Sequence, residues 1–451
     1  MSFPKYGAYK DSGVEWLGEM PEHWGVAPLK YNSTCNDQAL SDSTPEDYEL
    51  EYVEISDVDE VQGITGTNSY IFADAPSRAR RIVQDGDVLI STVRTYLRAI
   101  APVVDPPNNL IASTGFAVIR PQEDGLIGNY LGYLLRAEWW IAEIISQSVG
   151  VSYPAINASD LVGIKVPVPA TSEQTQIARF LDHETARIDA LIAEQERLIE
   201  LLKEKRQAVI SHAVTKGCDR TVPMKDSGVE WLGEVPAHWA VINFQLVVSI
   251  AEGQVDPSIK PYSEMVLIAP NHIESRTGRI LSVETAEEQG ADSGKYLCQA
   301  GDVVYSKIRP ALRKVCIATE DSLCSADMYP MRGHSGMSND YLFWFILSEP
   351  FSAFALLESD RVAMPKINRD SLGRLKVVRP PLSEQAEIAV YLNTETVRID
   401  ALVEQAKEGV KFLQERRSAL ISTAVTGKID VRGWQPPASA APAATLEAAR
   451  G

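Results

Sequence analysis

Two clusters of arginine and lysine give this chain its clearest means of binding an anionic ligand. In each cluster an arginine pair follows a Gly-Asp-Val sequence, with its members four residues apart, so both would share one face of a helical turn. A guanidinium either neutralises a phosphate or donates two hydrogen bonds to O6 and N7 of guanine. The alternative is an ion pair with a nearby carboxylate, such as Asp87 or Asp302. The first cluster contains Arg78, Arg80, Arg81, Arg94 and Arg98, and the second contains Lys307, Arg309, Arg313 and Lys314.

The overall charge argues against an anionic partner, because the chain carries a formal net charge of −18 at pH 7. Domains that bind phosphates are usually basic. Net charge describes the whole surface, however, and the local distribution of charge decides where an anion docks. Nucleic acid therefore stays a candidate partner, and the acidic remainder indicates surface that faces solvent or protein.

The sequence lacks the residue patterns of enzyme sites. It contains no Gly-x-x-x-x-Gly-Lys-Ser/Thr loop for a nucleotide. The run 105–108, Asp-Pro-Pro-Asn, resembles the motif with which adenine methyltransferases hold an extruded base, but Asn108 replaces the stacking aromatic residue. The five cysteines form no Cys-x-x-Cys pair, and His23 and His238 recur in a Pro-x-His-Trp segment, where packing beside tryptophan is the simpler role. We therefore predict no catalytic residue, no metal site and no cofactor bound by this chain.

The chain consists of two similar copies. Residues 10–24 return as residues 225–239 with two differences, at an offset of 225 − 10 = 215. Residues 172–191 resemble residues 383–402 at an offset of 383 − 172 = 211. Each copy of about 210 residues is long enough to bury a core of its own. Between these blocks the copies diverge, which predicts a repeated scaffold that carries two different specificities.

Positions that differ between the copies are the better candidates for reading the sequence of a ligand. Tyr153 corresponds to Met364, and Ala155 corresponds to Lys366, on either side of a proline that both copies share. We therefore add Tyr153 and Lys366 to the predicted contact residues.

Each copy is predicted to contain a mixed domain of strands and helices. In the first copy, short runs bounded by Gly, Asp or Pro predict strands at 52–55, 81–83, 87–90 and 116–119. Apolar residues at helical spacing predict one helix over residues 127–149. The predicted fold class is α+β, with two mixed α/β domains in tandem.

A long amphipathic helix is predicted after each mixed domain. Ser172 and Ser383 are the expected N-caps, each followed by a glutamate that suits the helix dipole. Such a seam either covers its own domain or pairs with another helix, and two matching seams favour an antiparallel intramolecular pair. About forty residues would make a rod of about 60 Å that holds the two domains apart. The seam residues are Leu181, Ile188, Gln195, Leu202 and Val209 in the first helix and Leu392, Ile399, Ala406, Leu413 and Leu420 in the second.

The repeated blocks resemble those of specificity subunits of type I restriction-modification systems. The resemblance rests on the tandem Lys-Asp-Ser-Gly-Val-Glu-Trp-Leu-Gly-Glu-x-Pro-x-His-Trp segments, the Pro-x-x-Ser-Glu-Gln helix starts and the paired Arg-Ile-Asp-Ala-Leu stretches. It covers the chain to about Asp430. It implies two target recognition domains in pseudo-twofold tandem, separated by two long antiparallel coiled-coil helices. The expected segments are a repeated segment at 1–28, a recognition domain at 29–170, a helix at 171–217, a repeated segment with the second recognition domain at 218–381, a helix at 382–428 and a disordered Ala/Pro-rich tail at 429–451.

The resemblance also implies a function and partners. Each recognition domain would read one half of a bipartite double-stranded DNA target, and the helices would set the gap and dock partner subunits. The expected partners are two adenine methyltransferase (modification) subunits and the endonuclease/translocase (restriction) subunits. S-adenosylmethionine, ATP and magnesium would be bound by those partners, and this chain would have no catalytic activity.

Two other functions stay open at this point. A stand-alone DNA-binding regulator would also need two reading domains, although the repeated tryptophan-rich segments and long seams favour an assembly surface. A protein-only scaffold would need the helices but no arginine clusters. Specific DNA binding, and co-purification with methyltransferase subunits, separate the three.

The sequence predicts a cytoplasmic protein without a membrane partner. No apolar run approaches the roughly 18 residues that a membrane span requires. The N-terminal residues also lack the apolar core of a signal peptide.

Overall fold

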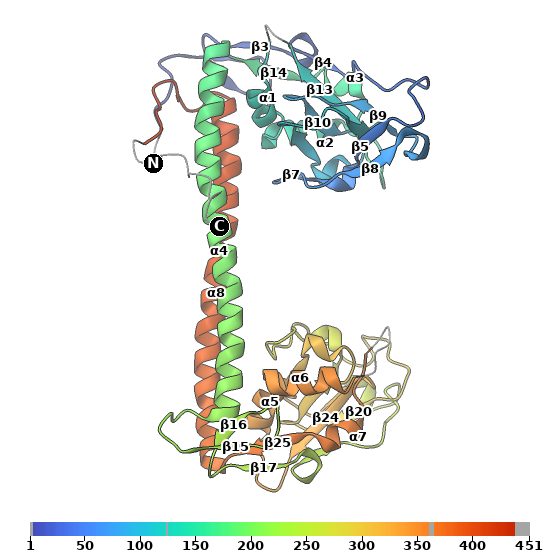
Figure 1. The fold of residues 1–451 in the computed structure, drawn as a ribbon, viewed down its shortest axis with the longest axis vertical. Helices are drawn as coiled ribbons and strands as arrows, with labels where there is room; N and C mark the ends of the chain where they lie inside the picture. Colours follow the sequence, from blue (N-terminus) through green and yellow to red (C-terminus); the bar gives the residue numbers. More distant parts are fainter. Residues whose placement is uncertain (1–2, 123–124, 360–364, 438–451) are drawn as a thin grey trace, which may run out of the picture. The chain divides into compact units, whose positions relative to one another are not determined.

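The structure is a computed structural model that describes residues 3–122, 125–359 and 365–437 (Figure 1). The described residues form two compact units. The first unit runs up to Glu194 and resumes at Gly409, and the second runs from Gln195 to Glu408. Both boundaries fall inside long helices, so each unit contains a part of each helix.

Two four-stranded sheets form most of the mixed domain of the first unit. The order of the first sheet is β11 (Ile100–Pro102), β10 (Val88–Ser91), β13 (Phe116–Pro121) and β4 (Ser33–Cys35). The order of the second is β8 (Asn68–Ile71), β5 (Glu49–Val53), β12 (Leu110–Ser113) and β9 (Ala79–Ile82). Three two-stranded sheets pair β1 (Tyr9–Asp11) with β2 (Glu19–Pro21), β3 (Gly25–Pro28) with β14 (Lys165–Val168), and β6 (Val58–Asp59) with β7 (Gly63–Ile64).

The second unit repeats this plan. Its larger sheet has the order β18 (Val248–Ile250), β24 (Met328–Gly333), β21 (Val303–Ser306) and β22 (Val315–Ile317). A three-stranded sheet follows the order β19 (Leu267–Ile268), β23 (Ser322–Cys324) and β20 (Tyr296–Cys298). Two small sheets pair β15 (Met224–Asp226) with β16 (Glu234–Pro236) and β17 (Ala240–Asn243) with β25 (Lys376–Arg379). In both units the second sheet contains one parallel pair, β12 with β5 and β23 with β19.

The predicted strands of the first copy are present as β5, β9, β10 and β13, with ends shifted by up to three residues. The single helix predicted at 127–149 is wrong, because the chain forms α1 (Gly128–Leu134) and α2 (Glu138–Gln147) with an extended residue, Ala137, between them. Apolar spacing continues across the break because both helices bury side chains in one core. In the second copy α5 (Asn339–Leu347) and α6 (Glu349–Leu357) meet at an extended Ser348. The remaining short helices are α3 (Ala158–Leu161) and α7 (Arg369–Arg374).

The two predicted long helices are α4 (Thr171–Lys216) and α8 (Leu382–Val425). In the first unit, Ile188 of α4 belongs to the same buried core as Leu420 and Ile421 of α8. In the second unit, Leu202 of α4 packs with Ile399 and other apolar residues of α8. The early part of each helix thus meets the late part of the other, which confirms the predicted antiparallel pairing within each unit.

The predicted N-caps are wrong by two residue positions. Both helices begin immediately before the serine, at Thr171 and Leu382, so Ser172 and Ser383 lie inside the first turn. The first helical hydrogen bonds are accepted by the carbonyl just before each helix. The N–H of Gln174 donates to the carbonyl of Ala170, and that of Gln385 donates to the carbonyl of Pro381. The glutamates do lie in the first turn, as predicted.

Two equivalent ion pairs join α4 to α8. Arg417 donates to Asp189 at 2.8 and 3.3 Å in the first unit, and Arg206 donates to Asp400 at the same two distances in the second. The two arginines lie 417 − 206 = 211 residues apart, and so do the two aspartates. Both aspartates belong to the repeated Arg-Ile-Asp-Ala-Leu stretch, so this motif fixes the register of the helix pair.

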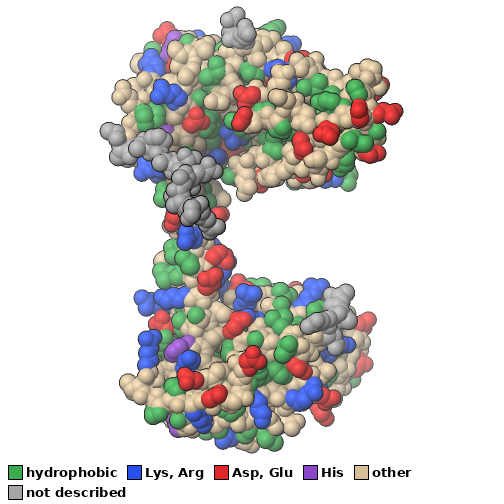
Figure 2. Space-filling view, viewed as in Figure 1, with side chains coloured by type: hydrophobic (Ala, Val, Ile, Leu, Met, Phe, Trp, Pro, Cys, Tyr) green, Lys and Arg blue, Asp and Glu red, His purple; other side chains and the backbone are tan. Residues whose placement is uncertain are grey.

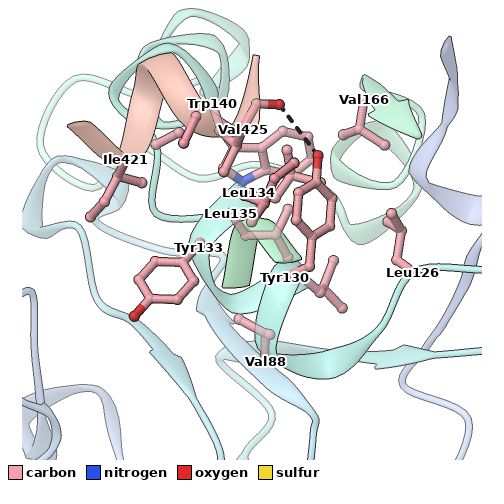
Figure 3. Close-up of a cluster of buried hydrophobic side chains, with 14 of the residues drawn as sticks. Val88, Leu126, Tyr130, Tyr133, Leu134, Leu135, Trp140, Val166, Ile421 and Val425 are labelled. Atoms are coloured by element: carbon pink, nitrogen blue, oxygen red, sulfur yellow. Dashed lines mark hydrogen bonds between the residues drawn. The ribbon is translucent and has the colours of Figure 1, made fainter. Parts of the chain in front are cut away.

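In each mixed domain, one tyrosine binds the end of the long helix that comes from the other copy, and the two tyrosines are equivalent. Figure 3 shows Tyr130 of α1 donating to the carbonyl of Val425, near the end of α8, at 3.3 Å. In the second unit Tyr341 of α5 donates to the carbonyl of Val214, near the end of α4, at 2.7 Å. Both tyrosines are fully buried, so each bond satisfies a hydroxyl that would otherwise be costly to bury.

The repeated Pro-x-His-Trp segments contact the helix starts. Nε2 of His23 lies 2.9 Å from Glu173, and Nε2 of His238 lies 2.8 Å from Glu384. The predicted packing of these histidines is present only in part: His238 meets the ring of Trp239 edge-on, but the shared contact is with the helix glutamate. The Ser-Glu-Gln motif and the histidine segment are therefore two sides of one scaffold joint.

The glutamines of the same motif bind the mixed domains. Nε2 of Gln174 donates to the carbonyls of Gly125 and Pro169 at 3.1 and 3.0 Å. Nε2 of Gln385 donates to those of Gly336 and Pro380 at 2.7 and 2.8 Å. Both side chains are buried, so each helix start is fixed to its own domain.

The tail predicted to be disordered from residue 429 is packed at its beginning. Val431 is buried, and the ring of Trp434 meets Phe180 of α4 at a centroid distance of 5.3 Å. The N–H of Asp430 donates to the carbonyl of Pro4. The composition of the later residues hid this apolar segment, and the part of the tail beyond residue 437 lies outside the described residues.

Among the described residues, no single helix is long and apolar enough to cross a membrane. The pair α5 and α6, bent by 65°, passes that test only when taken together, by length and composition.

We expect Asp400→Asn to lower the free energy of unfolding by about 1–3 kcal/mol, because the buried guanidinium of Arg206 loses its charged partner. The matched control is Glu200→Gln, which removes an exposed pair with Lys203 on the same helix and should cost less than about 0.5 kcal/mol. Urea unfolding of both variants measures the difference. Equal losses would show that the Arg206 pair does not fix the helix register.

Candidate nucleic-acid interface

Each arginine pair lies at a tight turn between two strands of the larger sheet. The turn of the first unit is a 3-10 helix, η4 (Thr95–Leu97), between β10 and β11. The turn of the second unit is η8 (Pro310–Leu312), between β21 and β22. The predicted helical face shared by both arginines is therefore wrong, since the arginines flank a single short turn.

All four of these arginines adopt the left-handed backbone conformation. The φ angles are 51° at Arg94, 53° at Arg98, 47° at Arg309 and 48° at Arg313. For a residue with a side chain this conformation costs about 1–2 kcal/mol, whereas glycine adopts it freely. An arginine that occupies such a position in both copies indicates that its side chain has a function that offsets the strain.

The second arginine of each turn is bound inside the protein. Nη1 of Arg98 donates to both Glu60 and Glu138 at 2.9 Å. In the second unit, Arg313 donates from Nε to Ser352 at 2.8 Å and from Nη2 to Glu349 at 2.5 Å. The hydrogen bond with Glu60, followed by that with Glu138, raises the pKa of Arg98.

The carboxylates proposed as alternative partners bind other arginines. Asp87 accepts two hydrogen bonds from Arg120, at 2.9 and 2.8 Å. Asp302 accepts two from Arg332, at 2.8 and 2.9 Å. Burial raises the pKa of Asp87 despite its arginine partner.

The first arginine of each turn is exposed. Its N–H donates to a proline carbonyl of the loop that precedes the next helix, Arg94 to Pro154 at 2.7 Å and Arg309 to Pro365 at 2.8 Å. The guanidinium of Arg94 lies 4.8 Å from the ring centroid of Tyr153, a cation–π contact. The structure thus brings together Arg94 and Tyr153, which were predicted as separate contact residues.

Exposed apolar and aromatic side chains surround Arg94 on the two loops that it joins. Val151 is fully exposed and Tyr153 is 64% exposed. A DNA duplex presents base edges in its grooves, and the thymine methyl group among them offers an apolar contact. The surface therefore combines a cation with groups suited to base edges; its exposed residues are Tyr96, Leu97, Val149, Val151 and Tyr153.

Lys366 lies beside the second turn. It forms an isolated β-bridge with Ile308, next to Arg309, and its side chain is exposed. Its counterpart in the first unit, Ala155, bridges Val93 in the same way. Met364, the counterpart of Tyr153, lies outside the described residues.

The remaining predicted basic residues are held away from the turns or within the fold. Arg78 is exposed just before β9 in the other sheet. On that strand Arg80 lies over the ring of Phe72, and Nε of Arg81 is buried without a partner among the described residues. Nζ of Lys314 donates to the carbonyl of Pro270 at 2.6 Å. Lys307 lies over the ring of Tyr329 with its Nζ 5.3 Å from the centroid.

The sequence reasoning missed the glutamates that bind the second arginines. Glu138 and Glu349 are the first residues of α2 and α6, and they lie 349 − 138 = 211 residues apart. The offset is that of the matched blocks, so a search for carboxylates repeated at this offset would have found both.

Charged side chains of both signs lie on the surface of both units. On the face that Figure 2 shows, basic and acidic side chains are interspersed over both units, so the negative total does not exclude local anion binding. In the part of the chain that the structure describes, no group of three or more His, Cys, Asp or Glu side chains could hold a metal ion.

Comparisons with known proteins agree with this geometry. The family model of the type I restriction modification DNA specificity domain matches residues 41–201. The type I restriction enzyme EcoDI specificity subunit of Escherichia coli is 32% identical over 321 residues, which cover 68% of this chain and 71% of that subunit. The MjaVIII specificity subunit of Methanocaldococcus jannaschii is 27% identical over 320 residues, covering 67% and 70%.

Solved structures show the same fold. A chain described in connection with complex assembly and conformational transition of the type I R-M system has a TM-score of 0.69 and 22% identity, covering 90% of this chain and 98% of that chain. The HsdS subunit from Thermoanaerobacter tengcongensis has a TM-score of 0.53 and 21% identity over the same shares. By its sequence relatives, this chain belongs to the family of type I restriction enzyme specificity subunits, the non-catalytic DNA-recognition components of restriction-modification systems.

Proposed function

We propose that each unit reads one half of a bipartite double-stranded DNA target through the turn that carries Arg94 or Arg309. The observation that carries this proposal is a strained, exposed arginine at the same position of both copies. Among the described residues neither guanidinium forms an ion pair, and that of Arg94 lies over the ring of Tyr153. Each exposed guanidinium can therefore bind a phosphate or a guanine edge.

The differences around the two turns support two different half-sites. Tyr153 lies against Arg94 in the first unit, whereas Lys366 lies beside Arg309 in the second. Tyrosine offers an apolar ring and one hydroxyl, while lysine offers a point charge with three donors. Two turns of equal backbone thus present unlike chemistry to DNA.

The proposal extends to the rest of the complex. We propose two adenine methyltransferase subunits and the endonuclease/translocase subunits as partners, with S-adenosylmethionine, ATP and magnesium bound by them. Family membership supports a restriction-modification complex rather than a stand-alone regulator. Co-purification of the chain with these subunits, and methylation of mapped adenines by the complex, tests this part.

Substitution of Arg94 or Arg309 by glycine separates recognition from folding. We expect a free energy of unfolding within about 1 kcal/mol of the wild type, because relief of backbone strain offsets the added freedom of the unfolded chain. If the side chain contacts a guanine edge, binding should lose about 1–3 kcal/mol at one base position. If it contacts a phosphate, all sequences should weaken and the salt slope should fall by about one.

Binding isotherms of the complex across salt concentrations and single-base variants decide between these outcomes. Each variant serves as the control for the other, since Arg94→Gly should affect the first half-site and Arg309→Gly the second. Unchanged affinity at every salt concentration would exclude both kinds of contact.

Replacement of residues 240–376 by the matching domain of a related subunit should change one half of the methylated sequence. The replaced segment excludes both long helices, so the scaffold joint is kept. Methylation mapping in a host that carries the complex gives the result. A change in both halves would show that the domains do not read independently.

We also propose that the length of the paired helices sets the gap between half-sites. Insertion of four residues after Glu196 and after Lys407 lengthens each helix by about 6 Å. At about 3.4 Å per base-pair step, the unspecified gap should grow by one or two base pairs while both half-sites keep their sequence.

The control for this experiment is an insertion into one helix alone, which mispairs the apolar seams and should weaken or abolish methylation. Methylation mapping reads both variants. If a complex with the doubly lengthened subunit assembles and still methylates only the original spacing, the helix length does not set the gap between half-sites.

A further inference from the structure

Arg98 and Arg313 differ from their neighbours in what surrounds the side chain. They follow η4 and η8 directly, and both are left-handed. The side chain of Arg98 is 33% exposed, and that of Arg313 is 8% exposed. In each unit, therefore, one arginine of the turn faces outward and the other is turned toward the protein.

The inward arginine binds the first residue of a helix in its own domain. Arg98 reaches Glu138 at the start of α2, and Arg313 reaches Glu349 at the start of α6. Both helices contribute to the main core of their unit. The pair thus links a surface turn to a rigid element in both copies.

In the second unit this link continues to the scaffold. The N–H of Glu349 donates to Oγ of Ser211 on α4 at 2.9 Å, while its carboxylate accepts from Arg313. The turn that carries Arg309 is therefore connected to the long helix through a single residue.

The backbone of the outer arginine, Arg309, is held by the loop that contains Pro365. The N–H of Arg309 is bound to Pro365, and the N–H of Ile367 donates back to the carbonyl of Lys307 at 3.0 Å. The backbone on both sides of Arg309 is thus fixed, and the direction of its guanidinium depends on the turn as a whole.

We propose that Arg98 and Arg313 are positioning residues, which aim Arg94 and Arg309 at DNA through their ion pairs with Glu138 and Glu349 and do not contact DNA themselves. This inference rests on the proposed function of the turns. It explains why arginine occupies a second strained position that glycine would fill more easily: the side chain is needed, but its partner is a protein carboxylate.

Removal of the glutamate distinguishes positioning from direct contact by the sign of the effect. If Arg98 or Arg313 bound DNA, Glu→Gln at Glu349, or at both Glu60 and Glu138, would free the guanidinium and remove negative charge near the phosphates, so binding would stay equal or tighten. If the arginine positions the turn, the same change must weaken specific binding. The isosteric glutamine keeps the shape of the site, and near-unchanged thermal unfolding shows that the fold is kept.

The experiment uses the complex of the full chain with its methyltransferase subunits and a duplex that carries the mapped target. We expect Glu349→Gln to weaken specific binding by about tenfold or more, because Arg313 is buried. Glu138→Gln should weaken it by about twofold to fivefold, since that pair is partly exposed and Glu60 still binds Arg98. Each loss should be confined to one half-site. The matched control is Glu358→Gln, which removes the pair with the exposed Arg374 in the second unit and should leave binding unchanged.

Exchange of the charges in the first unit, Arg98→Glu with Glu138→Arg, is made in a chain that also carries Glu60→Gln, which removes the second carboxylate bound to Arg98. It should recover most of the affinity that Arg98→Glu loses in the same chain. Equal or tighter binding by Glu349→Gln, or no recovery on exchange, would overturn the positioning role while leaving the proposed function intact. A wild-type complex that binds no sequence specifically would overturn the proposed function, and this inference with it.

Discussion

Each compact unit depends on a helix end supplied by the other copy of the repeat. The buried hydroxyl of Tyr130 has its partner carbonyl on α8, and that of Tyr341 has its partner on α4. The ion pairs of Asp189 and Asp400 repeat the same exchange. Neither mixed domain therefore has its full core without both helices. This exchange accounts for the blocks that the two copies share, because any residue that joins a domain to the helix pair must suit both ends.

The backbone strain at the four arginines depends on the contacts that hold each turn in place. Four arginines in the left-handed backbone conformation together cost several times the roughly 1–2 kcal/mol of a single one. Such strain persists only where the surrounding structure over-determines the backbone. Here the strands before and after each turn and the bond to Pro154 or Pro365 provide that constraint. Under the proposed function, the exposed arginine of each turn contacts DNA, and the arginine bound to a glutamate holds the turn in place.

The sequence predicted the elements whose pattern is local and periodic. The seam spacing identified α4 and α8, and β-branched runs bounded by Gly, Asp or Pro identified β5, β9, β10 and β13. The prediction failed where tertiary contacts override periodicity. The apolar residues of α1 and α2 keep helical spacing because they pack in one core, although the extended Ala137 separates the two helices. It also failed at Val431 and Trp434, because a few apolar residues beside a low-complexity tail show no periodic pattern.

At the candidate site, too, the sequence alone could not predict contacts between residues far apart in the chain. Sequence alone placed all four turn arginines in one class, since their type and spacing are equal. Only the fold separates them, because the partners Glu60, Glu138 and Glu349 are 36 to 40 residues away in the chain. On this proposal the arginines of each turn have two roles. Arg98 and Arg313 hold the backbone of the turn, and Arg94 and Arg309 extend from it toward DNA. The unlike residues, Tyr153 and Lys366, lie next to Arg94 and Arg309, respectively. A duplicated subunit can therefore change what it reads by substitution beside Arg94 or Arg309 while the contacts that hold the turn stay the same.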